Sequence, residues 1–231
     1  MDDRNGSHTD IYAQRIDSDG NPQWAIDGDS ICTASGNQFY PELVSDGAGG
    51  AIITWEDERD DPDGDIYAQR VNRDGTLGPV PYILSIEDVP NDQGRQVSVL
   101  WERSFLDAPQ YDLITEYSIW RKYPQGAKIE ATGREWDGRL PETIVPGIYR
   151  RMETKSKGQE TKTDYWELLG VVEAHFWEGY AYIAATLNDS SAGGVPYFTY
   201  VVSAHTGDPH VFYDSRADSG YSVDDLSLIH I

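Results

Sequence analysis

The six residues DIYAQR occur at Asp10–Arg15 and again, without change, at Asp65–Arg70. The copies stand 55 residues apart (65 − 10), and the same offset aligns the residues on either side of them. DDR (2–4) aligns with DER (57–59), and IDSDGN (16–21) aligns with VNRDGT (71–76). Self-similarity at a fixed period indicates a fold built from repeated units. Residue 1 aligns with Glu56, so we expect the chain to open inside a repeat.

Short strands are expected within and between the copies. The candidate strands are PELVSD (41–46), AIITWED (51–57) and DIYAQRVN (65–72), each bounded by turn residues. Alternation places Ala51, Ile53 and Trp55 on one strand face, and Gly-Gly and Asp-Gly pairs supply the positive φ that tight hairpins need. About four strands per repeat, with no helical period, are typical of a β-propeller blade.

The repeated DIYAQR text, together with SDGAGGAIITWED (45–57), resembles a blade repeat of large secreted bacterial proteins. The resemblance covers residues 2–85 and implies partial β-propeller blades, about one and a half of them, whereas a propeller needs at least four. Neighbouring blades of the parent chain are therefore expected partners. Because residues repeated in every copy serve packing, we predict that DIYAQR is scaffold, with Ile11 and Ala13 facing inward and Tyr12 and Gln14 on the opposite face.

Acidic turns beside the repeats hold the candidate metal ligands. Asp17-Ser18-Asp19-Gly20-Asn21 resembles the opening of a calcium loop, because oxygen ligands at alternate positions converge on a hard cation. The loop ERDDPDG (58–64) is the second acidic stretch. The candidate calcium ligands are Asp17, Asp19, Asn21, Asp61, Asp63 and Asp65. The alternative is ordinary Asp-Gly turn chemistry, since Gly28 stands where a calcium loop of the EF-hand type has its glutamate.

From about Ile86 the pattern changes to longer alternating strands. The in-phase sets are Val97, Val99 and Trp101; Tyr117, Ile119 and Arg121; and Phe198, Tyr200, Val202 and Ala204. These strands resemble B, C and F of a fibronectin type III domain, and SGYSVDDL (219–226) resembles the last strand. The resemblance covers residues 86–226 and implies an immunoglobulin-like β-sandwich. Phe198 stands where the family has a corner tyrosine, so either Tyr197 or Tyr200 substitutes for it, or the register is shifted by one residue.

A long insertion, about residues 124–164, separates the expected C strand from YWELLGVV (165–172). Residues 121–162 carry 10 of the 18 basic residues, whereas residues 1–90 carry 19 acidic and 5 basic ones. The insertion either docks on the acidic first region or is a solvated loop. METKSKGQETKT (152–163) lacks an apolar period and is predicted to be a mobile loop, and IVPGIYRR (144–151) a short strand or hairpin arm.

Composition excludes several classes of function. The 231 residues include 40 Asp and Glu against 18 Lys and Arg, a net charge of −22, which disfavours nucleic acid and anionic membranes as partners. No apolar run approaches the ~20 residues of a membrane-spanning helix. The single cysteine, Cys32, excludes an internal disulfide and indicates a small apolar strand residue.

The aromatic residues permit two interpretations. Trp166, Trp177, Tyr180 and Tyr182 either stack on sugar rings, as in carbohydrate-binding modules, or fill a core, and alternation favours the sandwich interior for Tyr180 and Tyr182. No metalloprotease, serine-hydrolase or nucleotide-binding motif is present. His205 and His210 flank an expected turn without a further ligand.

These observations predict an all-β, non-enzymatic chain without cofactor other than the candidate calcium. The expected function is a non-catalytic extracellular adhesion, display or spacer module of a larger bacterial secreted or cell-surface protein, with protein or glycan as partner. The alternatives are an accessory carbohydrate- or protein-binding region of a secreted hydrolase, and a calcium-stabilised carbohydrate binder. LSLIHI (226–231) resembles one reading frame of a sequencing-library adapter, so we expect a fragment with a non-native tail at 227–231.

Overall fold

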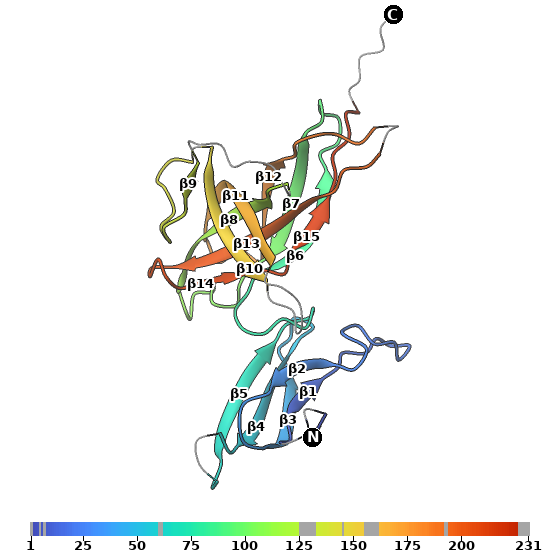
Figure 1. The fold of residues 1–231 in the computed structure, drawn as a ribbon, viewed down its shortest axis with the longest axis vertical. Helices are drawn as coiled ribbons and strands as arrows, with labels where there is room; N and C mark the ends of the chain where they lie inside the picture. Colours follow the sequence, from blue (N-terminus) through green and yellow to red (C-terminus); the bar gives the residue numbers. More distant parts are fainter. Residues whose placement is uncertain are drawn as a thin grey trace, which may run out of the picture. The chain divides into compact units, whose positions relative to one another are not determined.

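A computed structural model of the chain describes residues 2–4, 6, 8–59, 62–124, 133–144, 146–154, 162–191 and 194–225. The regular elements of these residues are all strands, arranged in several antiparallel sheets, so the predicted all-β class is confirmed (Figure 1). In this described part of the chain no helix is long and apolar enough to cross a membrane. The contacts divide the chain into two compact units, Met1–Pro79 and Val80–Ile231.

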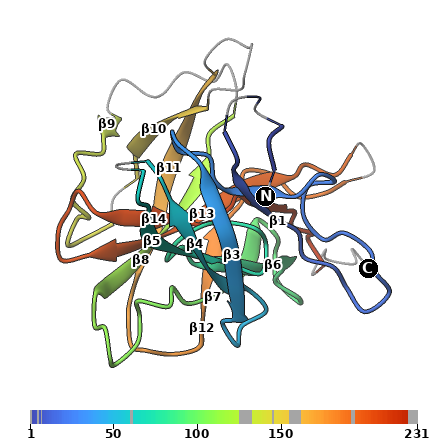
Figure 2. The same cartoon turned by 90° about the horizontal axis from the view of Figure 1, so that it is seen from below.

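The first unit contains two small antiparallel sheets. Its strands are β1 (Ile11–Ala13), β2 (Asp29–Cys32), β3 (Gln38–Ser45), β4 (Ala51–Asp57) and β5 (Asp65–Val71). β1 pairs with β2, and the second sheet has the order β3-β4-β5, which can be followed in Figure 2. The strands predicted at 41–46, 51–57 and 65–72 are present.

The two sheets of the first unit pack through one small apolar cluster. Ile11 and Ile31 from β1 and β2 are buried against Ile53, Trp55 and Val71 from β4 and β5. Because β4 alternates, its odd-numbered residues face this cluster and its even-numbered residues face the other way. The predicted common face of Ala51, Ile53 and Trp55 is therefore confirmed.

The two DIYAQR copies differ in burial. Ile11 is 2% exposed, as predicted for an inward-facing residue, whereas its equivalent Ile66 is 77% exposed. In the second copy the opposite face is inside, since Tyr67 packs on the cluster and stacks on Trp55. Identical residues thus have different surroundings, because the β1–β2 sheet covers only one face of the β3-β4-β5 sheet.

The second unit is a sandwich of two sheets. One sheet contains β6 (Tyr82–Asp88), β7 (Gln96–Glu102) and β12 (Gly179–Ala185), in the order β12-β7-β6. The other contains β8 (Ile114–Lys122), β9 (Arg134–Glu135), β10 (Ile148–Thr154), β11 (Lys162–Glu173), β13 (Phe198–Thr206), β14 (Phe212–Asp214) and β15 (Asp218–Gly220). Its order is β14-β13-β8-β11-β10-β9, and β15 also pairs with β13.

The main core lies between these two sheets. It contains all three predicted strand faces, with Trp101, Tyr117, Tyr200 and their in-phase neighbours fully or almost fully buried. Tyr180 is 3% exposed and Tyr182 packs on the same core, as alternation predicted. β6 begins at Tyr82 and pairs with β7, so the division after Pro79 lies six residues before the boundary expected from the sequence (85 − 79).

The insertion extends the larger sheet and covers its outer face. β10 forms a hairpin with β11, in which Met152 pairs with Asp164 and Thr154 pairs with Lys162. The ends of the predicted loop 152–163 are therefore strand, because backbone pairing with the anchored β11 requires no apolar period; residues 155–161 lie outside the described residues. A second core gathers on this face, formed by Trp120, Ile148, Trp166, Leu168 and Val201.

The last predicted strand is shorter than expected. β15 covers Asp218–Gly220 only, and Ser222 adds an isolated bridge to Asp189. The predicted tail 227–231, together with Leu226, lies outside the described residues.

Candidate functional site

A carboxylate clasp surrounds the buried side chain of Asp57 in the first unit. Trp55 Nε1 donates to Asp57 Oδ2 over 2.8 Å, the backbone N–H of Arg59 donates to Oδ1 over 3.0 Å, and the Arg59 guanidinium lies 2.5 Å from Oδ2. Burial by itself would raise the pKa of this carboxyl, but the hydrogen bonds from Arg59 and Trp55 outweigh burial and hold the pKa well below its usual range. Asp57 is therefore charged and structural.

The aspartate–arginine part of this clasp also occurs in the first copy. Asp2, the equivalent of Asp57, accepts hydrogen bonds from the backbone and guanidinium of Arg4, which lower its pKa to about 2. Arg4 lies 4.0 Å above the ring of Tyr12, and its equivalent Arg59 lies 3.9 Å above the ring of Tyr67. The repeated Asp-x-Arg stretch therefore places its arginine on the tyrosine of the DIYAQR copy that follows it.

The first calcium candidate forms an ordinary turn. Asp17 Oδ1 accepts the backbone N–H groups of Asp19 and Asn21 over 2.9 and 2.8 Å, and Gly20 adopts φ 86°. The equivalent turn in the second copy has the same backbone, with Gly75 at φ 86° and the N–H of Asn72 bonded to Thr76 as that of Asp17 is to Asn21. Since that copy lacks the first carboxylate, the shared geometry does not depend on a metal.

The other candidate ligands lie on the second acidic loop and on β5. Asp65 is the first residue of β5 and lies opposite Asp57 of β4 in the sheet. Asp63 is exposed, and Asp61 lies outside the described residues. Over the described ranges, no three His, Cys, Asp or Glu side chains are grouped so that they could hold a metal ion. The calcium site remains a prediction.

A fully buried carboxylate, Asp107, organises one end of the sandwich. Its Oδ2 accepts the hydroxyls of Tyr117 and Tyr180 over 2.8 and 2.7 Å, and its Oδ1 accepts the backbone N–H of Phe176 over 3.0 Å. Burial and the nearby Asp107 charge raise the pKa of Tyr117 far above its usual range. Both tyrosines therefore remain hydrogen-bond donors, and the network connects the loops that follow β7 and β11.

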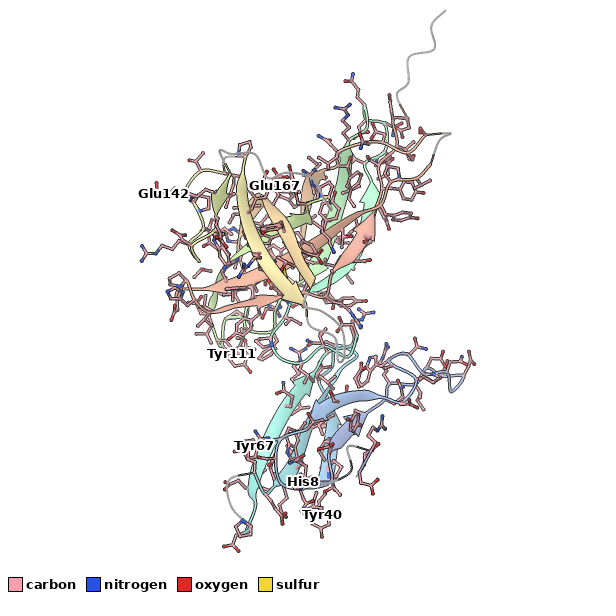
Figure 3. All side chains as sticks on the ribbon, in the orientation of Figure 1. His8, Tyr40, Tyr67, Tyr111, Glu142 and Glu167 are labelled. Atoms are coloured by element: carbon pink, nitrogen blue, oxygen red, sulfur yellow. The ribbon has the colours of Figure 1, made fainter. Side chains whose placement is uncertain are left out.

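The Tyr200 hydroxyl forms a hydrogen bond between the two sheets of the second unit. Its hydroxyl donates to the carbonyl of Ala185 over 3.2 Å, at the end of β12. Arg121 donates to the same carbonyl over 2.7 Å and pairs with Glu167 over 2.6 Å; Glu167 is labelled on β11 in Figure 3. Of the two candidate substitutes, Tyr200 is thus the buried one, whereas Tyr197 is 63% exposed.

Basic residues of the 121–162 stretch, from β8 and from the predicted insertion, pair within the second unit. Lys122 lies 2.7 Å from Asp164, and Arg150 lies 2.8 Å from Asp214. Arg150 is buried and its guanidinium stacks 4.4 Å above the ring of Trp120. These cations therefore support the larger sheet itself.

A serine and a histidine share a buried hydrogen bond on the same sheet. Ser118 Oγ lies 2.7 Å from His205 Nε2 and also accepts the indole N–H of Trp120 over 2.6 Å. Burial, reinforced by the Arg150 cation, lowers the pKa of His205 to about 4, so the ring is neutral at pH 7. Ser118 is completely buried, which denies a substrate access to its hydroxyl.

A shallow pocket of about 360 Å³ opens beside His205. Its lining residues are Thr115, Glu116, Gly138, Arg139, Leu140, His205, Thr206, Gly207 and Pro209. Burial, with the neighbouring Glu173, raises the pKa of Glu116. The lining carries the Glu116 carboxyl and the Arg139 guanidinium, which are groups that can bind a small polar ligand.

The aromatic candidates divide between core and surface. Trp166 and Tyr180 are buried, whereas Trp177 is 59% exposed beside His175, with ring centroids 4.8 Å apart. Trp177 is therefore the one residue of the predicted cluster that is available to a ligand.

Sequence reasoning missed Asp107 and the Ser118–His205 pair. Neither carries a local motif, because each network joins residues from distant strands. The Asp57–Arg59 clasp had a signal that could have found it, namely the DDR and DER stretches at the repeat offset. A scan of the chain against models of known protein families gave no match, and a search of the curated proteins found none that matches.

Proposed function

We propose that this chain is a non-catalytic extracellular display or spacer module of a bacterial secreted or cell-surface protein. The observation that carries the proposal is the repeated clasp, in which Asp2–Arg4–Tyr12 and Asp57–Arg59–Tyr67 make the same contacts. A catalytic group is needed once, whereas a structural contact is useful in every copy. Polar residues that recur with their contacts therefore favour a scaffold built of propeller-like blades.

The second unit supports the same proposal. Its sheets, β12-β7-β6 and β14-β13-β8-β11, have the strand order expected for E-B-A and G-F-C-C′ of a fibronectin type III domain. The bond from Tyr200 to Ala185 supports assigning Tyr200 as the corner tyrosine of such a domain. We assign the insertion between β8 and β11 as a decoration of such a sandwich. A stable antiparallel sandwich suits a spacer that carries load between other domains.

Force spectroscopy on the full chain, held at its two ends, tests the spacer function. The second unit should unfold in one cooperative event that releases roughly 500 Å, because 152 residues (231 − 79) extend by about 3.3–3.6 Å each. The first unit should give a smaller event. Extension without any force peak would contradict a spacer.

A substrate screen tests the absence of catalysis. Ester, peptide and glycoside substrates are compared for the unchanged chain and for His205→Ala and Ser118→Ala. We expect no turnover in any of them. Turnover that disappears in either variant would establish an enzyme and remove the proposal.

A glycan-binding module is the second candidate, and exposed Trp177 is the observation that favours it. A glycan panel with the unchanged chain and Trp177→Ala separates the candidates. Binding that Trp177→Ala abolishes would favour the accessory carbohydrate-binding role.

A further inference from the structure

Each DIYAQR strand has two unlike faces. In the first copy Ile11 and Ala13 form what we call the Ile/Ala face, and Tyr12 with Ile16 forms the Tyr face. The repeat offset gives Ile66 and Ala68 for the Ile/Ala face of the second copy, and Tyr67 and Val71 for its Tyr face.

Inside the first unit, the Ile/Ala face of the first copy packs on the Tyr face of the second. Ile11 is 2% exposed and Val71 is fully buried, and Ala13 and Tyr67 join the same apolar cluster. Trp55 extends the Tyr face and stacks on Tyr67 with ring centroids 6.3 Å apart. One complete interface between two repeats is therefore present within the chain.

The outer faces of the same two copies carry exposed isoleucines. Ile66, the equivalent of buried Ile11, is 77% exposed, and Ile16, the equivalent of buried Val71, is 62% exposed. Val44 and Ile52 extend the Ile/Ala face of the second copy, since they pair across β3 and β4, and they are 61% and 41% exposed. Figure 3 labels Tyr67 on the sheet that carries this face. An exposed apolar sheet face of this kind marks an interaction surface.

We propose that the chain associates head to tail with a second copy of itself, the Ile/Ala face around Ile66 of one copy packing on the Tyr face around Tyr12 and Ile16 of the next. The internal interface indicates that the partner is a second copy of the chain. Ile11 and Val71 meet at that interface, and their repeat equivalents Ile66 and Ile16 are the residues exposed on the two outer faces. Such a contact joins unlike surfaces, so it does not close after two copies and produces rings or open chains. It goes beyond the spacer function and is independent of it.

Charge sets the conditions for this association. Each copy carries −22, so long-range repulsion opposes the contact at low ionic strength. The contact buries the exposed isoleucines, whose attraction salt does not screen, and the charged residues Glu56 and Arg70 on the same face are opposite in sign. Association should therefore increase with salt, the opposite of a contact made by ion pairs.

Sedimentation of the full chain in moderate salt tests the proposal. The weight-average mass should rise with concentration above the 25.9 kDa of one chain, through dimers to larger species. Ile66→Glu removes the Ile/Ala face and Ile16→Glu removes the Tyr face, and each variant alone should remain monomeric. Both side chains are largely exposed, so their replacement should leave thermal unfolding unchanged.

Mixing the two variants gives the decisive result. Ile66→Glu retains a Tyr face and Ile16→Glu retains an Ile/Ala face, so a 1:1 mixture should form dimers of one copy each and nothing larger. Ala68→Glu replaces Ile66→Glu if the latter fails to fold. A monomeric unchanged chain at all concentrations, association that survives in either variant, or a mixture that stays monomeric would each overturn the proposal.

Discussion

The two units of this protein obtain stability in different ways. The second unit encloses a core between two sheets, with Trp101 and Trp120 completely buried on either side of the larger sheet. The first unit has one cluster of five buried apolar residues and leaves Ile52 and Ile66 exposed on the outer face of its sheet. A sandwich buries the inner faces of its two sheets against each other, whereas a repeat unit buries one face on its neighbour and exposes the other.

The comparison between the two repeat copies sharpens this difference. The contacts between aspartate and arginine recur in both copies, but Asp57 also accepts the Trp55 indole N–H and is fully buried, whereas the side chain of Asp2 is 26% exposed. A repeated sequence therefore reproduces local hydrogen bonds, while burial depends on which copy has a neighbour. Replacing equivalent residues of the two copies should therefore change the free energy of unfolding by different amounts.

The largest expected effect is in the second unit. Trp101→Ala should lower its free energy of unfolding by about 3–5 kcal/mol, because the ring is completely buried against Tyr117 and Tyr180. Denaturation followed by near-UV circular dichroism measures the change. Trp177→Ala, at a 59% exposed position, is the matched control and should change stability by less than about 0.5 kcal/mol. Equal effects would mean that the core is not where the structure has it.

The second effect compares the two clasps. Asp57→Ala should destabilise the first unit by about 2–4 kcal/mol, because it leaves the Trp55 indole N–H and the Arg59 cation without their acceptor. Asp2→Ala, at the equivalent exposed clasp, should leave the urea midpoint of the first unit almost unchanged. A loss at Asp2 as large as that at Asp57 would show that burial does not separate the copies.

The third effect is a pH dependence confined to the second unit. The pKa of His205 is about 4 in the folded chain and about 6.5 when unfolded, so the unfolded state binds the proton first as pH falls. The free energy of unfolding should be highest above about pH 6.5 and should fall by up to roughly 3 kcal/mol as the pH decreases to about 4. Urea unfolding across this range measures the loss.

His205→Gln should flatten that profile, and His175→Gln, at a half-exposed side chain, should not. A profile that is unchanged by His205→Gln would assign the pH dependence to another group. The first unit should lose stability only at lower pH, where Asp57, whose pKa is depressed, becomes protonated.

The smallest effect distinguishes a turn from a calcium loop. Asp17→Asn places in the first copy the residue type that Asn72 provides in the second, so the turn should persist and the melting temperature of the first unit should not change. The melting temperature should also be the same in calcium and in EDTA. A calcium-dependent increase that Asp17→Asn abolishes would establish the predicted metal site.

Much of the fold was predictable from short-range patterns. Alternation correctly placed Val97, Val99 and Trp101 in the core, and the repeat offset correctly implied equivalent turns at Gly20 and Gly75. The Asp107 network could not be predicted, because its tyrosines come from β8 and β12 and meet only when the sheets pack. The strand ends at Thr154 and Lys162 were missed because their pairing relies on backbone groups, which leave no trace in the residue types.

The all-β class, the repeat and the face that most strands bury can be read from the residues alone, because alternation and turn chemistry act over a few residues. Which copy of DIYAQR buries its isoleucine depends on how the sheets pack, because Ile11 lies against β4 and β5, whereas Ile66 lies on the outer face of that sheet and is 77% exposed. Tertiary packing also brings Ser118 and His205 together out of reach of solvent. The physical reason is that burial belongs to the packing of sheets and not to the strand in which a residue lies.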